Sequence, residues 1–229
     1  MSFSNFIKYV RKSKDITQQE LSDQLGVNRS AIRQFETGII HMPSDRVLNA
    51  LANYLQIDKY TVMNYILFDS SDYESMFNYE EQIKGNISYR YVCYLAINGW
   101  NFDQGPLLFK MNENGIRLLT AQMTKKREPD NKILISSIKN HLEGQTITKT
   151  QLKEIFGSTL GYLLCAEDKK YKGFHLIFNS LSKYDVQIFN NYKELVTGKL
   201  NYDYQFILFD PIKCEIKESI SIKTHVRKQ

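Results

Sequence analysis

The chain has 229 residues, of which 42% are hydrophobic and 24% are charged, the composition of a soluble globular protein with room for two modest domains. No apolar run approaches the ~20 residues of a membrane span, and the N-terminus has no signal-peptide pattern, so we expect a cytoplasmic protein without a membrane partner. Three distant cysteines, and no Cys or His pair at ligand spacing, predict reduced thiols and no metal site.

The net charge of +5 is distributed unevenly along the chain. Residues 1–66 carry eight Lys or Arg against six Asp or Glu, residues 67–84 carry one against five, and residues 85–229 carry twenty-one against fourteen. We therefore predict an N-terminal domain over 1–68, an acidic connector over 69–85 and a second domain over 86–229. The mildly basic first domain suits DNA, while the charge of the second suits phosphates, an acidic protein partner or simply solvated lysines.

The first predicted helix covers residues 4–12, where Phe6, Ile7 and Val10 recur at helical spacing. Two more helices follow within the segment ITQQELSDQLGVNRSAIRQFETG, which comprises residues 16–38. The segment therefore holds the second and third predicted helices of the chain.

Local signals mark where these two helices begin and end. Thr17 and Glu20 have the spacing of a capping box, and Gly26 occupies a left-handed position that ends a helix. Asn28 is a favourable N-cap for the next helix, whose inner face carries Ile32. Its outer face is left with the polar side chains of Arg29, Ser30, Arg33 and Gln34. This pattern is a helix-turn-helix, and it predicts a DNA-binding protein.

Two further helices complete the first domain. Pro43 and Ser44 precede the fourth, and Asp58 can cap the fifth. Their buried residues are expected to be Val47, Leu48, Leu51, Leu55, Val62, Tyr65 and Ile66. The first domain is thus predicted to be all-α.

The second domain is predicted to be α+β with mainly antiparallel strand pairing. A helix over 87–99 should bury one face, formed by Ile87, Tyr91, Tyr94 and Leu95. The Asn114-Gly115 pair predicts a hairpin turn between 106–111 and 116–123, and the polar stretch 124–132 indicates a surface loop. A capping-box spacing at Thr148 and Gln151 predicts another helix.

The remaining segments are less regular. Residues 159–166 and 172–179 are expected to form a second hairpin across 167–171, and residues 182–197 fit either a helix or a strand. Residues 203–210 are strand-like up to Pro211. Apolar residues alternate after that proline, which predicts a strand with one buried face made by Cys214, Ile216, Ile220 and Ile222.

Over residues 3–66 the chain resembles the Cro/CI-type, or XRE, family of helix-turn-helix transcriptional regulators. The resemblance is carried by FIKYVRKSK, ITQQELSDQLGV, NRSAIRQFETG and PSDRVLNALANYLQID. It implies a five-helix, lambda-repressor-like domain whose third helix enters the major groove of DNA. Residues 67–229 resemble no family that we recognise.

The resemblance also implies roles for individual residues. Gln18 matches a position that binds a phosphate and braces the third helix. The alternative is that Gln18 has no role beyond starting its own helix. Positions that contact base edges correspond to Asn28, Arg29, Ser30 and Gln34. Other DNA contacts are implied for Arg33, for Thr37 with the Gly38 amide, and for His41 and Arg46. For Arg33 the alternative is a side chain that only faces solvent. Arg11 and Glu36 match a structural ion pair of relatives.

The chemistry of these side chains suits base recognition. Arg29 can donate two hydrogen bonds to guanine O6 and N7, and Gln34 or Asn28 can pair with adenine. Ser44 stands where part of the family has a basic residue that reads the minor groove. Minor-groove reading at that point is therefore not expected.

Taken together, these features predict a dimeric, sequence-specific repressor of a phage or mobile element that binds a pseudo-palindromic operator. An antirepressor protein or a small ligand acting on the second domain would release the DNA. The alternative is a bifunctional inhibitor, an anti-CRISPR or antitoxin, fused to a self-repressing helix-turn-helix domain. No HExxH, GxxxxGK[ST] or Ala-Gly/Cys-Gly cleavage motif is present, so we expect neither an enzyme nor a cofactor.

Overall fold

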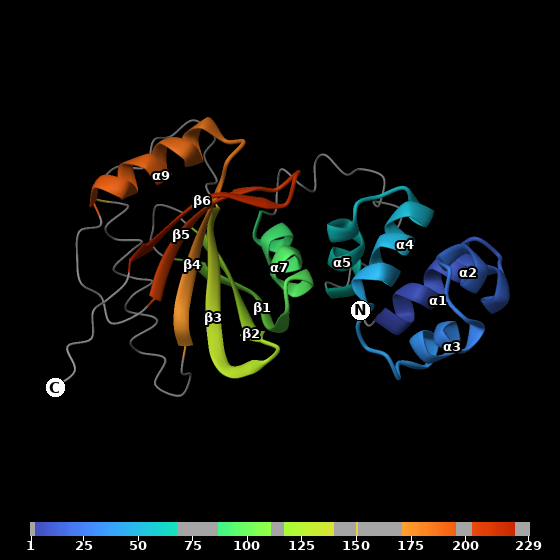
Figure 1. Cartoon of the computed structure of the whole chain (residues 1–229). Coiled ribbons are helices and arrows are strands. Elements are labelled where there is room, and N and C mark those ends of the chain that lie inside the picture. Colours follow the sequence, from blue (N-terminus) through green and yellow to red (C-terminus); the bar gives the residue numbers. More distant parts are fainter. Residues whose placement is uncertain are drawn as a thin grey trace. The chain divides into compact units, whose positions relative to one another are not determined.

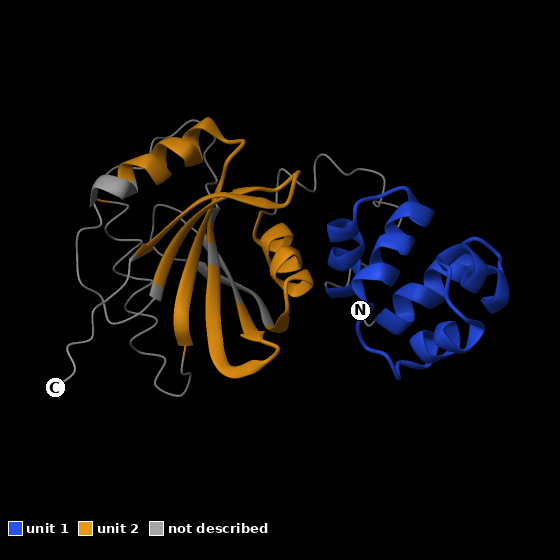
Figure 2. Ribbon diagram, in the orientation of Figure 1, with its two compact units in different colours: residues 1–82 blue, residues 83–229 orange. Residues whose placement is uncertain are grey.

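The computed structural model describes residues 3–67, 87–110, 117–139, 150, 171–195 and 203–222. The chain separates into two compact units, residues 1–82 and residues 83–229 (Figure 2). Four predicted features lie outside the described residues: the connector at 69–85, the turn at Asn114-Gly115, the helix after Thr148 and the strand at 159–166.

The described part of unit 1, residues 3–67, consists of five helices, which confirms the predicted all-α domain (Figure 1). Their bounds are α1 (Phe3–Ser13), α2 (Gln18–Leu25), α3 (Arg29–Thr37), α4 (Asp45–Leu55) and α5 (Lys59–Leu67). The predicted caps account for these ends. Thr17 and Glu20 form the complete capping box of α2, and Asn28 and Ser44 cap α3 and α4. The carboxylate of Asp58 accepts the backbone N–H groups of Tyr60 and Thr61.

The core of unit 1 lies where α1 meets α3 and α5. Phe3 packs against Phe35 with ring centroids 5.1 Å apart, and Phe6 stacks on Tyr65 at 6.2 Å. Leu55 of α4 is only half-buried, whereas Ala52 is fully buried, so the inner stripe of α4 is displaced slightly from the predicted one. Burial of these apolar faces fixes the direction in which α3 presents its polar face.

Unit 2 is built on a six-stranded mixed sheet, in agreement with the predicted α+β class (Figure 1). Its elements are α7 (Ile87–Ile97), β1 (Trp100–Lys110), β2 (Arg117–Lys125), β3 (Glu128–Lys139), β4 (Tyr171–Asn179), α9 (Lys183–Leu195), β5 (Asp203–Asp210) and β6 (Glu215–Ile222). The strands lie in chain order from β1 to β6. Three neighbouring pairs are antiparallel, and β4 is parallel to both β3 and β5.

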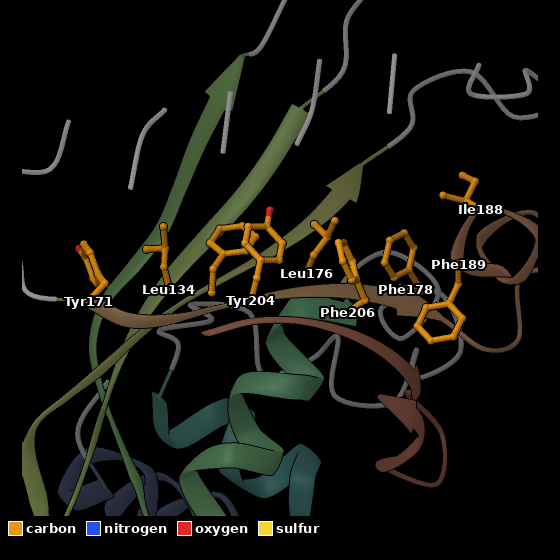
Figure 3. Packing of buried hydrophobic residues seen from close by; sticks show 9 residues of the cluster. Leu134, Tyr171, Leu176, Phe178, Ile188, Phe189, Tyr204 and Phe206 are labelled. Atoms are coloured by element: carbon orange, nitrogen blue, oxygen red, sulfur yellow. The ribbon is translucent and has the colours of Figure 1, made fainter. Parts of the chain in front are cut away.

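The two helices described in unit 2, α7 and α9, cover opposite faces of this sheet. Adjacent residues of β4 point to opposite sides, and Phe174 belongs to the cluster under α9 while His175 meets Tyr91 of α7. Figure 3 shows the α9-side cluster, in which side chains of β3, β4 and β5 form a row that continues into Ile188 and Phe189 of α9. The cluster comprises Leu134, Tyr171, Phe174, Leu176, Phe178, Ile188, Phe189, Tyr204 and Phe206.

Helix α7 is buried more extensively than the predicted single face. Tyr91 and Leu95 are buried, but Ile87 and Tyr94 are only half-buried. The polar side chain of Arg90 is also buried, and its guanidinium Nε donates to the Pro211 carbonyl at 2.9 Å. Burial of a charged group is tolerable when hydrogen bonds satisfy it in this way.

The predicted second hairpin is wrong. Its expected second strand is β4, which pairs in parallel with β3 on one side and β5 on the other. Residues 173–178 are all buried, and a continuous apolar run of this kind is typical of a central parallel strand covered on both faces. The expected first strand, residues 159–166, lies outside the described residues. Residues 183–195, left open between helix and strand, form α9.

Two smaller expectations also fail, the second of them in part. The polar stretch 124–132 is no extended loop, because β2 reaches Lys125 and β3 begins at Glu128, with only two turn residues between them. The predicted buried face of Cys214, Ile216, Ile220 and Ile222 holds only in part: Cys214 is buried, but the bulge between the pairs Leu208–Glu218 and Phe209–Ile216 interrupts the alternation at Ile216, and the side chain of Ile222 lies outside the description. Ile216 is consequently exposed, while Ile220 packs against the α9-side cluster.

Candidate DNA-binding surface

Helix α3 is fixed at both ends by its own capping groups. The Oδ1 atom of Asn28 accepts the Ala31 N–H at 2.7 Å. At the other end Gly38 adopts a left-handed conformation with φ of 76°, and the Ile39 N–H donates to the Gln34 carbonyl at 3.0 Å. A helix held in this way can present side chains with little loss of backbone freedom.

The outward face of α3 carries four exposed polar side chains, Arg29, Ser30, Arg33 and Gln34. Ile32 and Phe35 on the opposite face are buried. In the part of the chain that the structure describes, the side chains of Arg29, Arg33 and Gln34 make no hydrogen bond or ion pair. Arg29 and Arg33 are four residues apart and so lie on the same side of the helix. Two guanidinium groups and one carboxamide are therefore available to a ligand.

Asn28 and Ser30 are exposed as well, but their hydrogen-bonding groups are partly committed. The Oδ1 atom of Asn28 accepts both the Ala31 N–H and the Ser30 hydroxyl, each at 2.7 Å. Pairing with adenine requires a carboxamide that accepts and donates together. Asn28 would have to release its cap to do so, whereas Gln34 would not. The structure thus separates two residues that the sequence treats as equivalent.

Gln18, Arg11 and Glu36 form one hydrogen-bonded group between α1, α2 and α3. The guanidinium of Arg11 donates through Nε to Glu36 Oε1 at 2.6 Å, and it also donates to the Ile16 carbonyl at 3.2 Å. Gln18 donates through Nε2 to Glu36 Oε2 at 2.7 Å. The carboxylate of Glu36 is 6% exposed, so these donors replace its lost hydration. The group ties the last turn of α3 to the two helices beside it.

The Glu36 carboxylate should make unit 1 sensitive to acid. Burial favours its neutral form, but hydrogen bonds from Arg11 and Gln18 and the charge of Arg11 outweigh burial and lower the pKa of Glu36. A carboxyl with a lowered folded-state pKa adds stability above its unfolded pKa of about 4.3 and loses it as pH falls through the folded value. We expect Glu36→Gln to lower the free energy of unfolding near neutral pH by about 1–3 kcal/mol.

Urea unfolding followed from neutral pH to about pH 3 tests this expectation. The difference in stability between wild type and Glu36→Gln should shrink as the pH falls, because both chains then carry a neutral group at position 36. Asp23→Asn, which removes an exposed carboxylate of α2, is the matched control and should follow wild type closely. A constant difference across the whole range would contradict the role assigned to Glu36.

The remaining residues of the predicted site surround α3 and differ in what they can offer. The Thr37 hydroxyl donates to the Arg33 carbonyl at 2.8 Å, and the Gly38 N–H donates to the Phe35 carbonyl at 3.1 Å. The helix end therefore already uses the amide that was expected to bind phosphate. His41 is exposed and, within the described residues, has no hydrogen-bond or ion-pair partner.

Arg46 has a structural contact that the sequence did not predict. Its Nη2 atom donates to the Gly26 carbonyl at 3.0 Å, so the first turn of α4 is tied to the end of α2. No local pattern signals this contact, since the two residues are twenty positions apart. The remaining guanidinium hydrogens still face solvent, because the side chain belongs to an exposed residue.

The described residues of unit 2 offer no comparable set of convergent polar side chains. Among their buried polar contacts are those of Tyr91 with His175 at 3.0 Å, of Ser88 with Ser137 and of Arg90 with the Pro211 carbonyl. The described residues contain no group of three or more His, Cys, Asp or Glu that could hold a metal ion. None of the described helices combines the length and apolarity needed to cross a membrane.

A pair of short helices joined by a tight turn, with a buttressed second helix that presents basic and amide side chains, defines a helix-turn-helix DNA-binding domain. The family comparison agrees: residues 7–60 match the helix-turn-helix family model of the XRE type. Residues 7–60 are accordingly similar to the DNA-binding domain of helix-turn-helix transcription regulators. The family is one of DNA-binding regulators, and the match does not extend into unit 2. The comparison with curated proteins found no match to the chain.

Proposed function

We propose that the protein is a sequence-specific transcriptional repressor that inserts α3 into the major groove of operator DNA. The observation that carries the proposal is the exposed face of α3, on which Arg29, Arg33 and Gln34 have no partner among the described residues. A ligand that covers these three groups removes their water, and binding is favourable only if the ligand forms hydrogen bonds with them in its place. Guanine O6 and N7 suit a guanidinium, and adenine N6 and N7 suit a carboxamide.

In this proposal the side chains have different tasks. Arg29 and Gln34 read base edges, and Arg33 contacts either a base or a phosphate. Ser30 and Asn28 lie at the helix N-terminus, where the positive end of the helix dipole favours a phosphate. Gln18 retains a second amide hydrogen for a phosphate after donating to Glu36. His41 and Arg46 contact the DNA backbone on the far side, and Thr37 joins them when its hydroxyl releases the Arg33 carbonyl.

We further propose that the repressor acts in the cytoplasm as a homodimer on a pseudo-palindrome. One recognition helix contacts only a few base pairs, and two copies bound one helical turn apart, about 10 bp, double the sequence that is read. Unit 2 has its own core and supplies the surface that joins the copies. Binding of an antirepressor protein or a small ligand to unit 2 would then separate the copies and release the DNA. Control of this kind suits a phage or another mobile element.

Arg29→Ala tests base reading by α3. The variant should bind its operator about 1–3 kcal/mol more weakly and lose its preference at one base position in each half-site. Fluorescence anisotropy with a set of operators, each changed at a single base pair, measures both effects. Arg127→Ala removes an exposed arginine from unit 2 and is the charge-matched control, expected to keep the preference of wild type.

The outcome that contradicts the proposal is specific. If Arg29→Ala weakens binding to every sequence by the same factor, Arg29 contacts only the DNA backbone, because phosphate contacts carry no sequence information. Selection of bound fragments from genomic DNA supplies the operator for these measurements.

A further inference from the structure

An exposed apolar surface lies at one corner of the sheet of unit 2. The described residues include four exposed large hydrophobic side chains, and two of them, Ile212 and Ile216, are four positions apart around the β5–β6 turn. Ile212 is 58% exposed and Ile216 is 39% exposed. The other two are Ile39 in unit 1 and Leu181 before α9. Clustered exposed apolar side chains indicate an interaction surface more often than isolated ones do.

The turn that carries Ile212 is rigidly built. The Asp210 carboxylate accepts the backbone N–H groups of Ile212 and Lys213 at 3.0 and 2.9 Å. From α7, the buried Arg90 donates to the Pro211 carbonyl at 2.9 Å and to the Ile212 carbonyl at 3.5 Å. The turn closes at Cys214, which is buried. Ile212 is thus held outward by a fixed backbone, and pre-organisation of this kind lowers the entropy that a partner must overcome.

The adjoining edge of the described sheet is formed by β6. β6 is the last strand in the order, and its outer side pairs with no strand in the described part of the chain. Ile216 lies on this edge between Glu215 and Lys217, whose side chains form an ion pair with each other. A bulge and charged residues at an edge oppose indiscriminate pairing, but they permit a partner with complementary charges.

The edge is complementary to itself. In an antiparallel contact about a two-fold axis through Ile216, that residue meets its own copy, and Glu215 of each chain faces Lys217 of the other. An axis through Lys217 or through Glu218 would instead oppose like charges. A two-fold contact requires such self-complementarity, with apolar residues at the centre and charges around them.

We infer that the β6 edge and the β5–β6 turn form the homodimer interface of the repressor, with a second copy of the chain as the occupant. Ile212 and Ile216 supply the apolar centre, and Glu215 and Lys217 exchange ion pairs across the axis. The inference rests on the proposed function, because it names the surface through which unit 2 joins the two DNA-bound copies.

Sedimentation equilibrium of the full chain without DNA tests the interface. Wild type should dimerise, and the double variant Ile212→Glu with Ile216→Glu should have a dimer dissociation constant at least about 10-fold higher, since burial of like charges opposes association. Leu181→Glu is the matched control, because it places the same charge on a 53% exposed residue elsewhere in unit 2. This control should dimerise as wild type does.

Charge exchange gives a second test that does not depend on apolar contacts. Glu215→Lys alone and Lys217→Glu alone should each dimerise poorly, and an equal mixture of the two variants should form heterodimers. Failure of the mixture to associate, a wild-type monomer, or a double isoleucine variant that dimerises like wild type would overturn the interface. Operator binding by wild type is measured separately. A chain that dimerises through β6 but ignores operator DNA would overturn the proposed function instead.

Discussion

A chain cut after residue 82 is expected to bind the operator about 100-fold or more weakly than the full chain, because linking two half-site contacts commonly raises affinity by about 10²–10⁴. Unit 1 has its own core around Phe6, Leu21 and Leu51, so the shortened chain should remain folded. The loss then reports the missing link between two copies and not a damaged recognition helix. Anisotropy at one fixed salt concentration measures it, since such affinities change steeply with salt.

DNA with a single half-site provides the control for this truncation. Full chain and shortened chain should bind one half-site with similar affinity, because only one recognition helix is engaged in either case. Equal affinity of the two chains for the complete operator would contradict the role of unit 2 in dimerisation. Unit 2 would then be limited to receiving a signal.

The second large effect concerns the core of unit 2. Phe206→Ala should lower the free energy of unfolding of this unit by about 3–5 kcal/mol, the range for truncating a fully buried aromatic residue. Phe206 is 0% exposed, and its ring lies 5.3 Å from that of Tyr204 and 6.3 Å from that of Phe178. The cavity left by the ring would adjoin the face of the sheet that α9 covers.

Urea unfolding followed by tyrosine fluorescence and circular dichroism measures this change. Leu181→Ala truncates an exposed residue of the same unit and should stay within about 0.5 kcal/mol of wild type. A Phe206→Ala variant as stable as that control would mean that the cluster beneath α9 repacks without loss. That result would contradict the assignment of Phe206 to the centre of the core.

Unit 1 could be predicted from its sequence because its helix ends are set by neighbouring residues. Thr17 with Glu20, Asn28 with Ala31 and Gly38 with Gln34 act within three or four positions, so each signal is visible in a short stretch. The exposed face of α3 follows from the same periodicity. Contacts between distant residues could not be read in this way, and the bond from Arg46 to the Gly26 carbonyl is the clearest case.

The same distinction explains the errors in unit 2. β4 pairs in parallel with β3 and β5, which are distant from it in the sequence. The residues near β4 do not indicate which strands it pairs with or in which direction. A short buried apolar run fits several kinds of element equally well. The alternation in β6 was real, but the bulge beside Leu208 shifts its register and turns Ile216 outward. Tertiary pairing decided each of these features.

The sequence predicted which residues form the candidate site, but it did not predict the hydrogen bonds that their side chains make. Helical spacing placed Arg29, Arg33 and Gln34 on one exposed face, and the structure has them there. The commitment of the Asn28 oxygen to the helix cap depends on a side-chain rotamer that spacing does not specify. We therefore propose Gln34, in preference to Asn28, as the residue that recognises adenine.

The most direct test of the account is binding of the purified full chain to double-stranded fragments that tile the DNA around its own gene, at low salt and with excess competitor DNA. We predict that one fragment or a small number of them is bound at least about 10³-fold more tightly than the competitor, a ratio typical of specific recognition. Protection of a two-fold symmetric sequence within the bound fragment would identify the operator. Equal, weak binding to every fragment would contradict sequence-specific recognition by α3.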